Sequence, residues 1–307
     1  MQSASTILIT GGTGLVGTRL SEMLIQQGFR VIVLTRDPSK QIATHPHLQF
    51  AKWDVAAGYI DPAVWAQADV VVHLAGAGVL AKPWTHAYKK ELVDSRVQSG
   101  KLLLHALQTE AHHINTVISA SGIGYYGADT GTQPFEETAE ADTGFIGDLC
   151  TQWEAAVQPV LQQGIRLVIA RLGIVIAREG GAMLKFKKSL KFRVAAVLGN
   201  GQQIISWIHI DDLCRFFIQA IADAQLQGVY NAVAPAPVSN QVLTLAIAQR
   251  QFGKGFITIH LPPFALKLLL GERSAEVLKS TTVSAEKLLQ YGFQFQYPTI
   301  DTALAVL

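Results

Sequence analysis

The chain has 307 residues, of which 49% are hydrophobic and 16% are charged. This composition supplies a large core and excludes an intrinsically disordered chain. Twenty-five basic residues against 23 acidic ones give a formal net charge of +2, so we expect neither a nucleic-acid partner nor a membrane surface as partner. We see no signal peptide and no apolar run of about 18 residues, and the two cysteines lack metal or redox spacing. We therefore expect a cytoplasmic protein without a metal site.

The first 36 residues carry the most informative pattern of the chain. An apolar strand around Ile7–Ile9 is followed by Gly11, Gly14 and Gly17, and then by an amphipathic helix that stops near Gly28. In such a unit one glycine permits the tight turn, one lets the backbone approach a pyrophosphate, and one lets the helix pack closely on the sheet. The free N–H groups and the positive dipole end of the helix then hold the phosphates. Because the glycines lie between a strand and a helix, the pattern predicts a dinucleotide site.

The second apolar strand, Val31–Leu34, ends at Thr35 and Arg36. A carboxylate at this place would bind the ribose 2′-hydroxyl of NAD, whereas a guanidinium suits the 2′-phosphate of NADP. Asp37 follows directly and weakens the distinction, and Arg36 could also be an ordinary exposed loop charge. We predict NADP(H) in preference to NAD(H).

The next two strands also end at residues that can face a cofactor. Leu48–Trp53 is predicted as a short strand that ends at Asp54, which either lies near the adenine or caps the next turn. Ala68–Leu74 is a continuous apolar strand, followed by the small residues 75–78, which let the backbone sit against a cofactor. His73 lies inside this strand, and a buried, hydrogen-bonded histidine is favoured over a catalytic one.

Helical and strand patterns continue to alternate along the chain. We predict helices over 84–107 and 145–163, strands over 116–120 and 166–173, and a helix that begins at Asp211 as its N-cap. This alternation predicts the α/β class, with a Rossmann-type doubly wound parallel sheet and a ligand beyond the carboxyl ends of its strands.

The predicted organisation has two interleaved parts. Residues 1–175 form the NADP-binding Rossmann domain, to which 205–232 return. Residues 176–204 and 233–307 form a smaller, interleaved C-terminal substrate lobe, and we expect the substrate between the two parts.

Motifs spread over the whole chain carry a resemblance to a known family. They are Thr10–Gly17, Thr35–Arg36, Leu74–Gly76, Trp84–Thr85, Ser121 with Tyr125–Gly127, Trp153–Glu154, Arg171–Gly173, Trp207–Asp212 and the tail 261–307. On these motifs the chain resembles the extended short-chain dehydrogenase/reductase superfamily, and within it the nucleoside-diphosphate-sugar epimerase-like YfcH subgroup with its small C-terminal domain.

The resemblance implies an NADP(H)-binding fold with a cleft like those for sugar nucleotides, and homodimers are common in the superfamily. The residues that it brings to the cofactor, together with the edge candidate Asp54, are Gly11, Gly12, Thr13, Gly14, Leu15, Val16, Gly17, Thr35, Arg36, Leu74, Ala75, Gly76, Glu91, Arg96 and Arg171.

The chain departs from the superfamily where the chemistry is done. Short-chain reductases normally use a tyrosine, a lysine four residues later and a serine to exchange a proton with the substrate oxygen. None of the seven tyrosines here has a lysine four residues later. Counting back from Glu154, the tyrosine position holds Ile146 and the lysine position holds Cys150.

The remaining candidates for catalysis are Ser121, Tyr125 and Tyr126. His209 with Asp211 could form an acid–base pair, although a capping role is favoured. Cys150 is better explained as a small buried residue than as a nucleophile.

The sequence is compatible with two alternative functions of different classes. The first is an NADP-dependent oxidoreductase or epimerase that acts on a nucleotide-sugar-like or other small polar substrate through a non-standard proton donor. The alternative is a non-catalytic NADP(H)-binding protein that senses the cofactor or regulates a partner.

Overall fold

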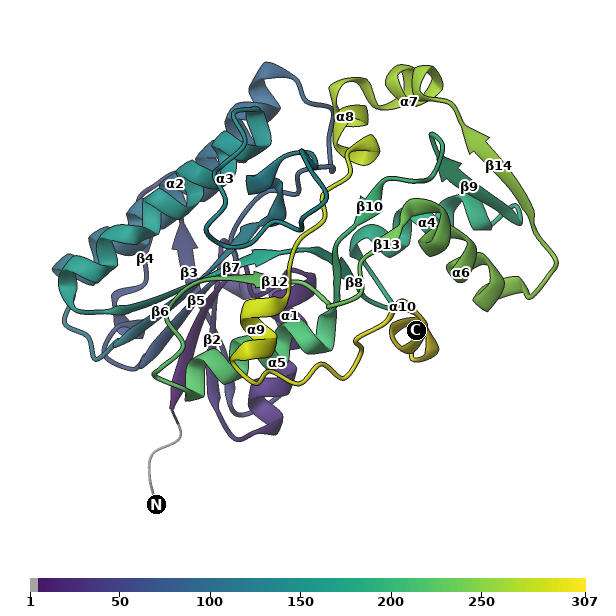
Figure 1. Cartoon of the computed structure of the whole chain (residues 1–307). Coiled ribbons are helices and arrows are strands. Elements are labelled where there is room, and N and C mark those ends of the chain that lie inside the picture. The colour runs from purple at the N-terminus through teal and green to yellow at the C-terminus, as the bar shows by residue number, and fades with distance from the viewer. Residues whose placement is uncertain (1–4) are drawn as a thin grey trace.

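The computed structural model describes residues 5–307, except for some side chains of the helix Gly181–Leu190. It consists of one large sheet covered by helices and a smaller lobe beside it (Figure 1). The strands are β1 (Thr6–Thr10), β2 (Arg30–Thr35), β3 (Leu48–Asp54), β4 (Tyr59–Ile60), β5 (Val70–His73), β6 (Thr116–Gly122), β7 (Arg166–Leu172), β8 (Ile174–Ile176), β9 (Val194–Leu198), β10 (Ile204–Ile205), β11 (Trp207–His209), β12 (Gly228–Ala232), β13 (Val238–Ser239) and β14 (Ile257–Leu261). The helices are α1 (Leu15–Gln26), α2 (His86–Thr109), α3 (Phe145–Val157), α4 (Gly181–Leu190), α5 (Ile210–Ala222), α6 (Asn240–Phe252), α7 (Pro263–Leu270), α8 (Ser274–Leu278), α9 (Glu286–Gln290) and α10 (Ile300–Ala305).

The large sheet has eight strands in the order β12-β7-β6-β5-β1-β2-β3-β4. All neighbours pair in parallel except β4, which runs antiparallel to β3. The strand order reverses between β1 and β5, which is the switch point where doubly wound sheets bind their ligands. The predicted fold class is therefore confirmed.

Both faces of the sheet are covered, as the continuous apolar strands require. Ile7 and Ile9 of β1 pack in one cluster with Phe216 of α5. Leu8 points to the other face and packs in a cluster with Leu103 of α2, because successive side chains of a strand alternate between faces. Figure 1 shows α2 and α3 together on one side of the sheet and α1 and α5 on the other.

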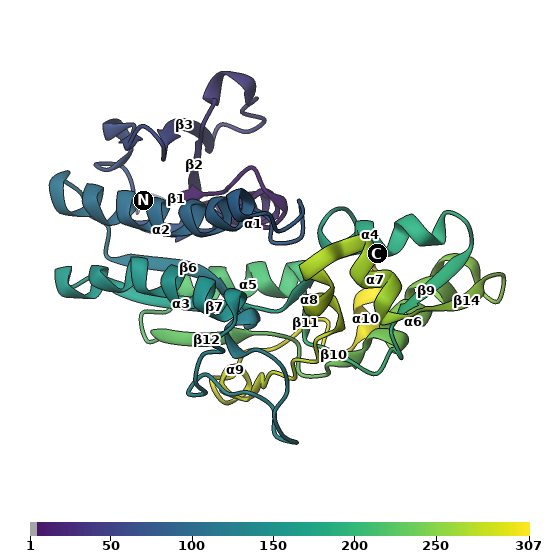
Figure 2. The ribbon, with the colours of Figure 1, turned by 90° about the horizontal axis from the view of Figure 1, so that it is seen from above.

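The smaller lobe has its own core and its own short sheets. β9 pairs in parallel with β14, and β10 pairs antiparallel with β13. Trp207 and Leu243 belong to the buried cluster of this lobe. In Figure 2 this lobe, with α6, α7, β9 and β14, lies beside one end of the sheet. β12 joins the large sheet next to β7, after the chain has already passed through the lobe.

Two predicted helices differ in detail from the structure. The helix expected over 145–163 ends at Val157 and continues as a 3-10 helix, Gln158–Gln163, because Pro159 cannot donate the hydrogen bond that an α-helix needs there. The helix expected to start at Asp211 begins at Ile210, and its N-cap is His209, whose Nδ1 accepts from the N–H of Asp211 at 3.2 Å. Asp211 is instead paired with Arg19 of α1 at 2.6 Å.

Within residues 5–307, none of the helices combines the length and the apolar character needed to cross a bilayer.

Candidate functional site

The glycine turn lies at the carboxyl end of β1, at the switch point of the sheet. Gly11 has φ +68°, and a Cβ there would stand 2.8 Å from the carbonyl carbon of Leu74. A Cβ on Gly17 would stand 2.5 Å from Gly12 Cα, so α1 packs directly on the turn. Gly14 is exposed and is the N-cap of α1, which has neither a capping side chain nor an acidic residue in its first turn. The turn therefore presents unshielded N–H groups, as an anion site requires.

The turn after β5 is held against β1 by a buried threonine. Thr10 Oγ1 accepts from the N–H groups of Leu74 at 3.1 Å and of Ala75 at 3.2 Å. With both acceptor positions used, the hydroxyl donates to His73 Nδ1 at 2.8 Å. Burial lowers the pKa of His73 to about 4, so the ring is neutral. The prediction of a buried, hydrogen-bonded histidine is confirmed, and its task is to hold the Thr10 hydroxyl in place.

The end of β2 separates two opposite charges. Arg36 is exposed, and no hydrogen bond or ion pair is formed by its guanidinium among the described residues. Asp37 turns back into its own loop, where it pairs with Lys40 at 2.6 Å and accepts from Ser39 Oγ at 2.7 Å. These contacts lower the pKa of Asp37, chiefly through Lys40. The Asp37 carboxylate is thus bound within its own loop, whereas the Arg36 guanidinium is available to bind a ligand.

Arg96 packs against the turn that follows β5. Its Nη2 donates to the Ala77 carbonyl at 2.9 Å, and its guanidinium lies 4.6 Å from the centre of the Trp153 ring. A Cβ on Gly76 would stand 3.1 Å from the guanidinium carbon, which explains the glycine. Arg96 is buried, and burial lowers its pKa. Its direct contact with a cofactor stays a prediction.

Two other predicted cofactor residues have local partners. Glu91 is exposed and paired with Lys82 at 2.9 Å. Asp54 Oδ1 accepts from the N–H groups of Ala56 and Ala57, each at 3.1 Å. Asp54 therefore caps the turn after β3, which was the alternative that the sequence left open.

Ser121 and Arg171 meet at the carboxyl ends of β6 and β7, where the strand register places them opposite each other. Ser121 Oγ donates to Glu154 Oε1 at 2.7 Å. Arg171 binds both oxygens of the same carboxylate, through Nε and Nη2, each at 2.9 Å. All three side chains are buried, and this bidentate geometry is the strongest form of such a pair. The sequence marked Glu154 as part of a motif but gave it no role.

The two neighbouring tyrosines have different environments. Tyr126 is buried, accepts from Arg171 Nη1 at 2.9 Å and donates to Asn231 Oδ1 at 2.5 Å. Burial raises the pKa of Tyr126 to about 12. The Tyr125 ring lies under the Arg171 guanidinium, 3.4 Å from ring centre to Cζ, and its hydroxyl has no hydrogen-bond partner among the side chains that the structure describes. Of these two tyrosines, Tyr125 is therefore the one whose hydroxyl is free to bind a ligand.

A cavity of about 930 Å³, here called the interlobe cavity, separates the sheet domain from the smaller lobe. Its walls include Trp84, Lys89, Phe145 and Ile146 from the starts of α2 and α3, and Phe264 and Glu272 from the smaller lobe. Ile146, the residue at the expected tyrosine position, thus forms part of the wall. One turn further along α3, Cys150 is buried, and burial raises the pKa of its thiol to about 11.

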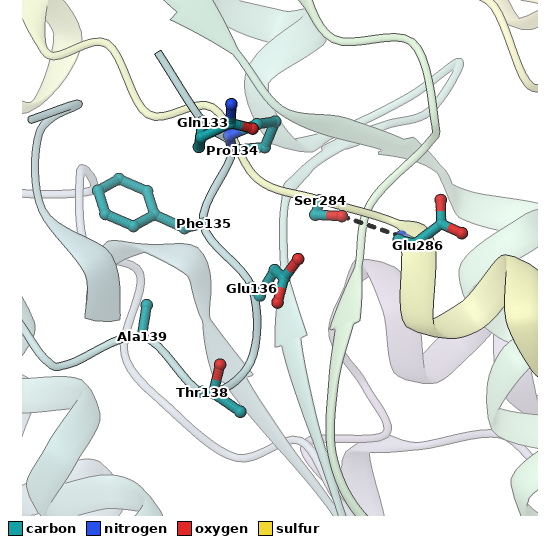
Figure 3. A pocket seen from close by; sticks show the side chains of 8 residues that line it. All are labelled: Gln133, Pro134, Phe135, Glu136, Thr138, Ala139, Ser284 and Glu286. Atoms are coloured by element: carbon teal, nitrogen blue, oxygen red, sulfur yellow. Dashed lines mark hydrogen bonds between the residues drawn. The ribbon is translucent and has the colours of Figure 1, made fainter. Parts of the chain in front are cut away.

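A second hollow, of about 530 Å³, lies between the loop 133–139 and the segment 284–286. Figure 3 shows Glu136 and Glu286 on these two facing segments, with the N–H of Glu286 donating to Ser284 Oγ at 3.1 Å. Two carboxylates in its wall make this hollow unsuited to phosphates. Among the described side chains, no group of three or more His, Cys, Asp or Glu residues is placed to hold a metal ion.

Comparisons with known proteins agree with this geometry. Residues 7–232 match the NAD dependent epimerase/dehydratase family, and residues 261–307 match a domain of unknown function, DUF1731. An epimerase family protein of Staphylococcus aureus is 34% identical over 299 residues, which cover 97% of each chain.

Solved structures show the same fold. The human epimerase family protein SDR39U1, determined with NADPH, superposes with a TM-score of 0.84 at 28% identity over 97% of each chain. A nucleoside-diphosphate sugar epimerase from Corynebacterium glutamicum gives a TM-score of 0.77 at 33% identity, over 99% of this chain and 58% of that one. A glycine turn at the switch point of a doubly wound sheet, together with a family match over most of the chain, places this protein in the NAD-dependent epimerase/dehydratase family of the extended short-chain dehydrogenase/reductase superfamily.

Proposed function

We propose that the protein binds NADP(H) at the glycine turn and carries out an oxidoreductase or epimerase reaction on a small molecule in the interlobe cavity. The residues present fit the cofactor. The α1 N-terminus is uncapped, and a Cβ on Gly14 would meet only the Gly11 carbonyl oxygen, at 3.2 Å, so space beyond the turn is open. When bound, the nicotinamide group supplies hydride chemistry.

The observation that carries the NADP preference is the unpaired Arg36 beside a paired Asp37. A guanidinium with no internal partner can bind a 2′-phosphate through two hydrogen bonds. That the human relative was determined with NADPH is consistent with this proposal.

The proposed site residues have separate tasks. Ser121 donates its proton to Glu154, so its oxygen lone pairs are what it can offer to a ligand hydroxyl. Tyr125 keeps a free hydroxyl, so it is our preferred proton donor, and the stacked Arg171 fixes the orientation of its ring. Tyr126 is assigned a structural task, because its oxygen is already bound to Arg171 and Asn231.

The cofactor assignment is tested by calorimetric titration of NADPH and NADH into wild type and Arg36→Ala. Wild type should prefer NADPH, and the variant should lose tenfold or more in NADPH affinity with little change for NADH, since hydrogen bonds to charged groups contribute about 1.5–3 kcal/mol. Arg30→Ala is the matched control, because Arg30 is exposed at the opposite end of the same strand. An unchanged NADPH-to-NADH ratio in Arg36→Ala, or no binding of either nucleotide, contradicts the proposal.

A second candidate function is a non-catalytic NADP(H) sensor. The absence of a lysine four residues after any tyrosine favours it, as does Ile146 in the cavity wall. Carbonyl substrates screened with NADPH distinguish the two. An enzyme should lose turnover in Tyr125→Phe with NADPH affinity retained, whereas a sensor shows no turnover in wild type.

A further inference from the structure

The interlobe cavity has an apolar floor that connects it with the proposed reaction site. The rings of Trp84 and Phe145 meet edge to face, with their centres 5.4 Å apart. Together with Ile146 and Tyr125 they belong to one apolar cluster. Phe264, which is 77% exposed, forms part of the facing wall. Such aromatic walls bury the apolar body of a small ligand.

One cation lies above this floor. Lys89 Nζ is 5.2 Å from the centre of the Phe145 ring and 6.0 Å from that of Trp84. Its ion-pair partner is Glu272, which comes from the smaller lobe on the other side of the cavity. The Lys89 side chain is 30% exposed, whereas that of Glu272 is 65% exposed. Because Glu272 can return to water at small cost, a ligand carboxylate could take its place on Lys89.

The remaining charges of the wall disfavour a ligand with several negative charges. No arginine belongs to the described wall, which holds two lysines, Lys89 and Lys267, against three carboxylates. The nearby Arg273 is engaged with the carbonyls of Leu270 at 3.2 Å and Leu80 at 3.3 Å. A diphosphate would therefore find no free guanidinium here. Its additional negative charges would lie near three carboxylates, of which Glu272 is paired with Lys89 and Glu276 with Lys279 at 2.9 Å.

We propose that the interlobe cavity binds an apolar monocarboxylate. Its carboxylate replaces Glu272 on Lys89, and its body lies between the Trp84–Phe145 pair and Phe264. This names the substrate class of the proposed enzyme, and in that respect it rests on the proposed function. The exchange also releases the ion pair that joins the two lobes across the cavity, so ligand binding and lobe contact compete for one cation.

The test uses 2-naphthoate, its neutral analogue 2-naphthylmethanol and uridine diphosphate, each titrated by calorimetry into the full chain. Lys89→Gln should weaken naphthoate about tenfold or more, because a charge-assisted hydrogen bond is lost. Glu272→Gln should tighten naphthoate severalfold, because it removes the competing carboxylate. Neither variant should change naphthylmethanol binding more than about twofold. Lys101→Gln, an exposed position further along α2, is the matched control and should change neither.

The affinity for naphthoate should change in opposite directions in the two variants. A merely structural role of the ion pair would instead change the affinities for all three probes in the same direction. The proposal is overturned if wild type does not bind naphthoate, if Lys89→Gln leaves its affinity unchanged, if Glu272→Gln weakens it, or if uridine diphosphate binds more tightly. NADPH is titrated into the same samples. If NADPH binds and naphthoate fails, only this inference falls; if NADPH also fails, the proposed function falls.

Discussion

The buried ion pair between Glu154 and Arg171 should account for a large part of the stability of the carboxyl end of the sheet. Glu154→Leu removes the partner of a guanidinium whose side chain is only 3% exposed, and with it two hydrogen bonds of 2.9 Å. Removing one member of a buried pair typically costs about 3–5 kcal/mol, because the other charge remains buried without a partner. Glu154→Leu also leaves the Ser121 hydroxyl without its acceptor. We expect a loss near the upper end of this range.

The double variant separates the contribution of the ion pair to stability from the contributions of its surroundings. Arg171→Leu alone should also destabilise, but Glu154→Leu combined with Arg171→Leu should cost several kcal/mol less than the sum of the two, since no charge is left unpaired. Urea unfolding followed by circular dichroism measures all three. Glu22→Leu is the control, because Glu22 belongs to an exposed pair with Arg19 and such pairs contribute about 0–1 kcal/mol. If the two single costs simply add, or if Glu154→Leu costs no more than Glu22→Leu, the ion pair is not what stabilises this end of the sheet.

Substitutions at His73 and Gly11 and chemical labelling of the two cysteines test three further consequences of the structure. Burial lowers the pKa of His73 to about 4, so as pH falls below about 6.5 the histidine of the unfolded chain binds a proton before that of the folded chain. Between pH 7 and pH 4.5 the free energy of unfolding, measured by urea titration, should therefore fall by about 2–3 kcal/mol more for wild type than for His73→Asn. Equal decreases for the two proteins contradict this prediction. Gly11→Ala should reduce NADPH affinity at least tenfold by calorimetry, because its Cβ meets backbone at 2.8 Å, whereas Gly28→Ala, also at positive φ but with nothing within 4 Å, should keep it. Cys150 and Cys214 are buried with raised thiol pKa values, so a disulfide reagent at pH 8 should label both only after unfolding, and rapid labelling of the native protein would refute their burial.

The sequence was most informative where one local pattern constrains the backbone. Gly11 and Gly17 could be interpreted in advance because their chemistry depends only on the tight turn and on the helix that follows it. The apolar runs were equally informative, since a strand buried on both faces must be apolar throughout, as Ile7–Ile9 is. Local pattern also suggested the alternatives at Asp54, but only the structure could decide between them.

The tasks of the buried arginines could not be predicted in the same way. Arg171 was placed at a strand end, yet its partner Glu154 lies 17 residues away on a helix. No periodicity reveals which carboxylate a guanidinium will meet after folding. The helix start at Asp211 was wrong for a related reason. Aspartate is a common N-cap, but here the preceding His209 provides the acceptor, and Asp211 is paired with Arg19 on another helix.

We expect that substitutions at positions 146 and 150 alone cannot restore the usual tyrosine–lysine pair. Ile146→Tyr should destabilise by overpacking, because Ile146 is buried and its Cγ2 lies so close to Gly124 that a Cβ there would stand only 2.3 Å from it. Cys150→Lys should destabilise by several kcal/mol, because it places an unpaired cation in a buried position where Arg96 and Arg171 already act on the thiol. Urea unfolding of the two single variants measures this directly, with Cys150→Met as the control for size. A Cys150→Lys protein as stable as wild type would show that this position still accepts a lysine, and would contradict the cost expected for an unpaired buried cation.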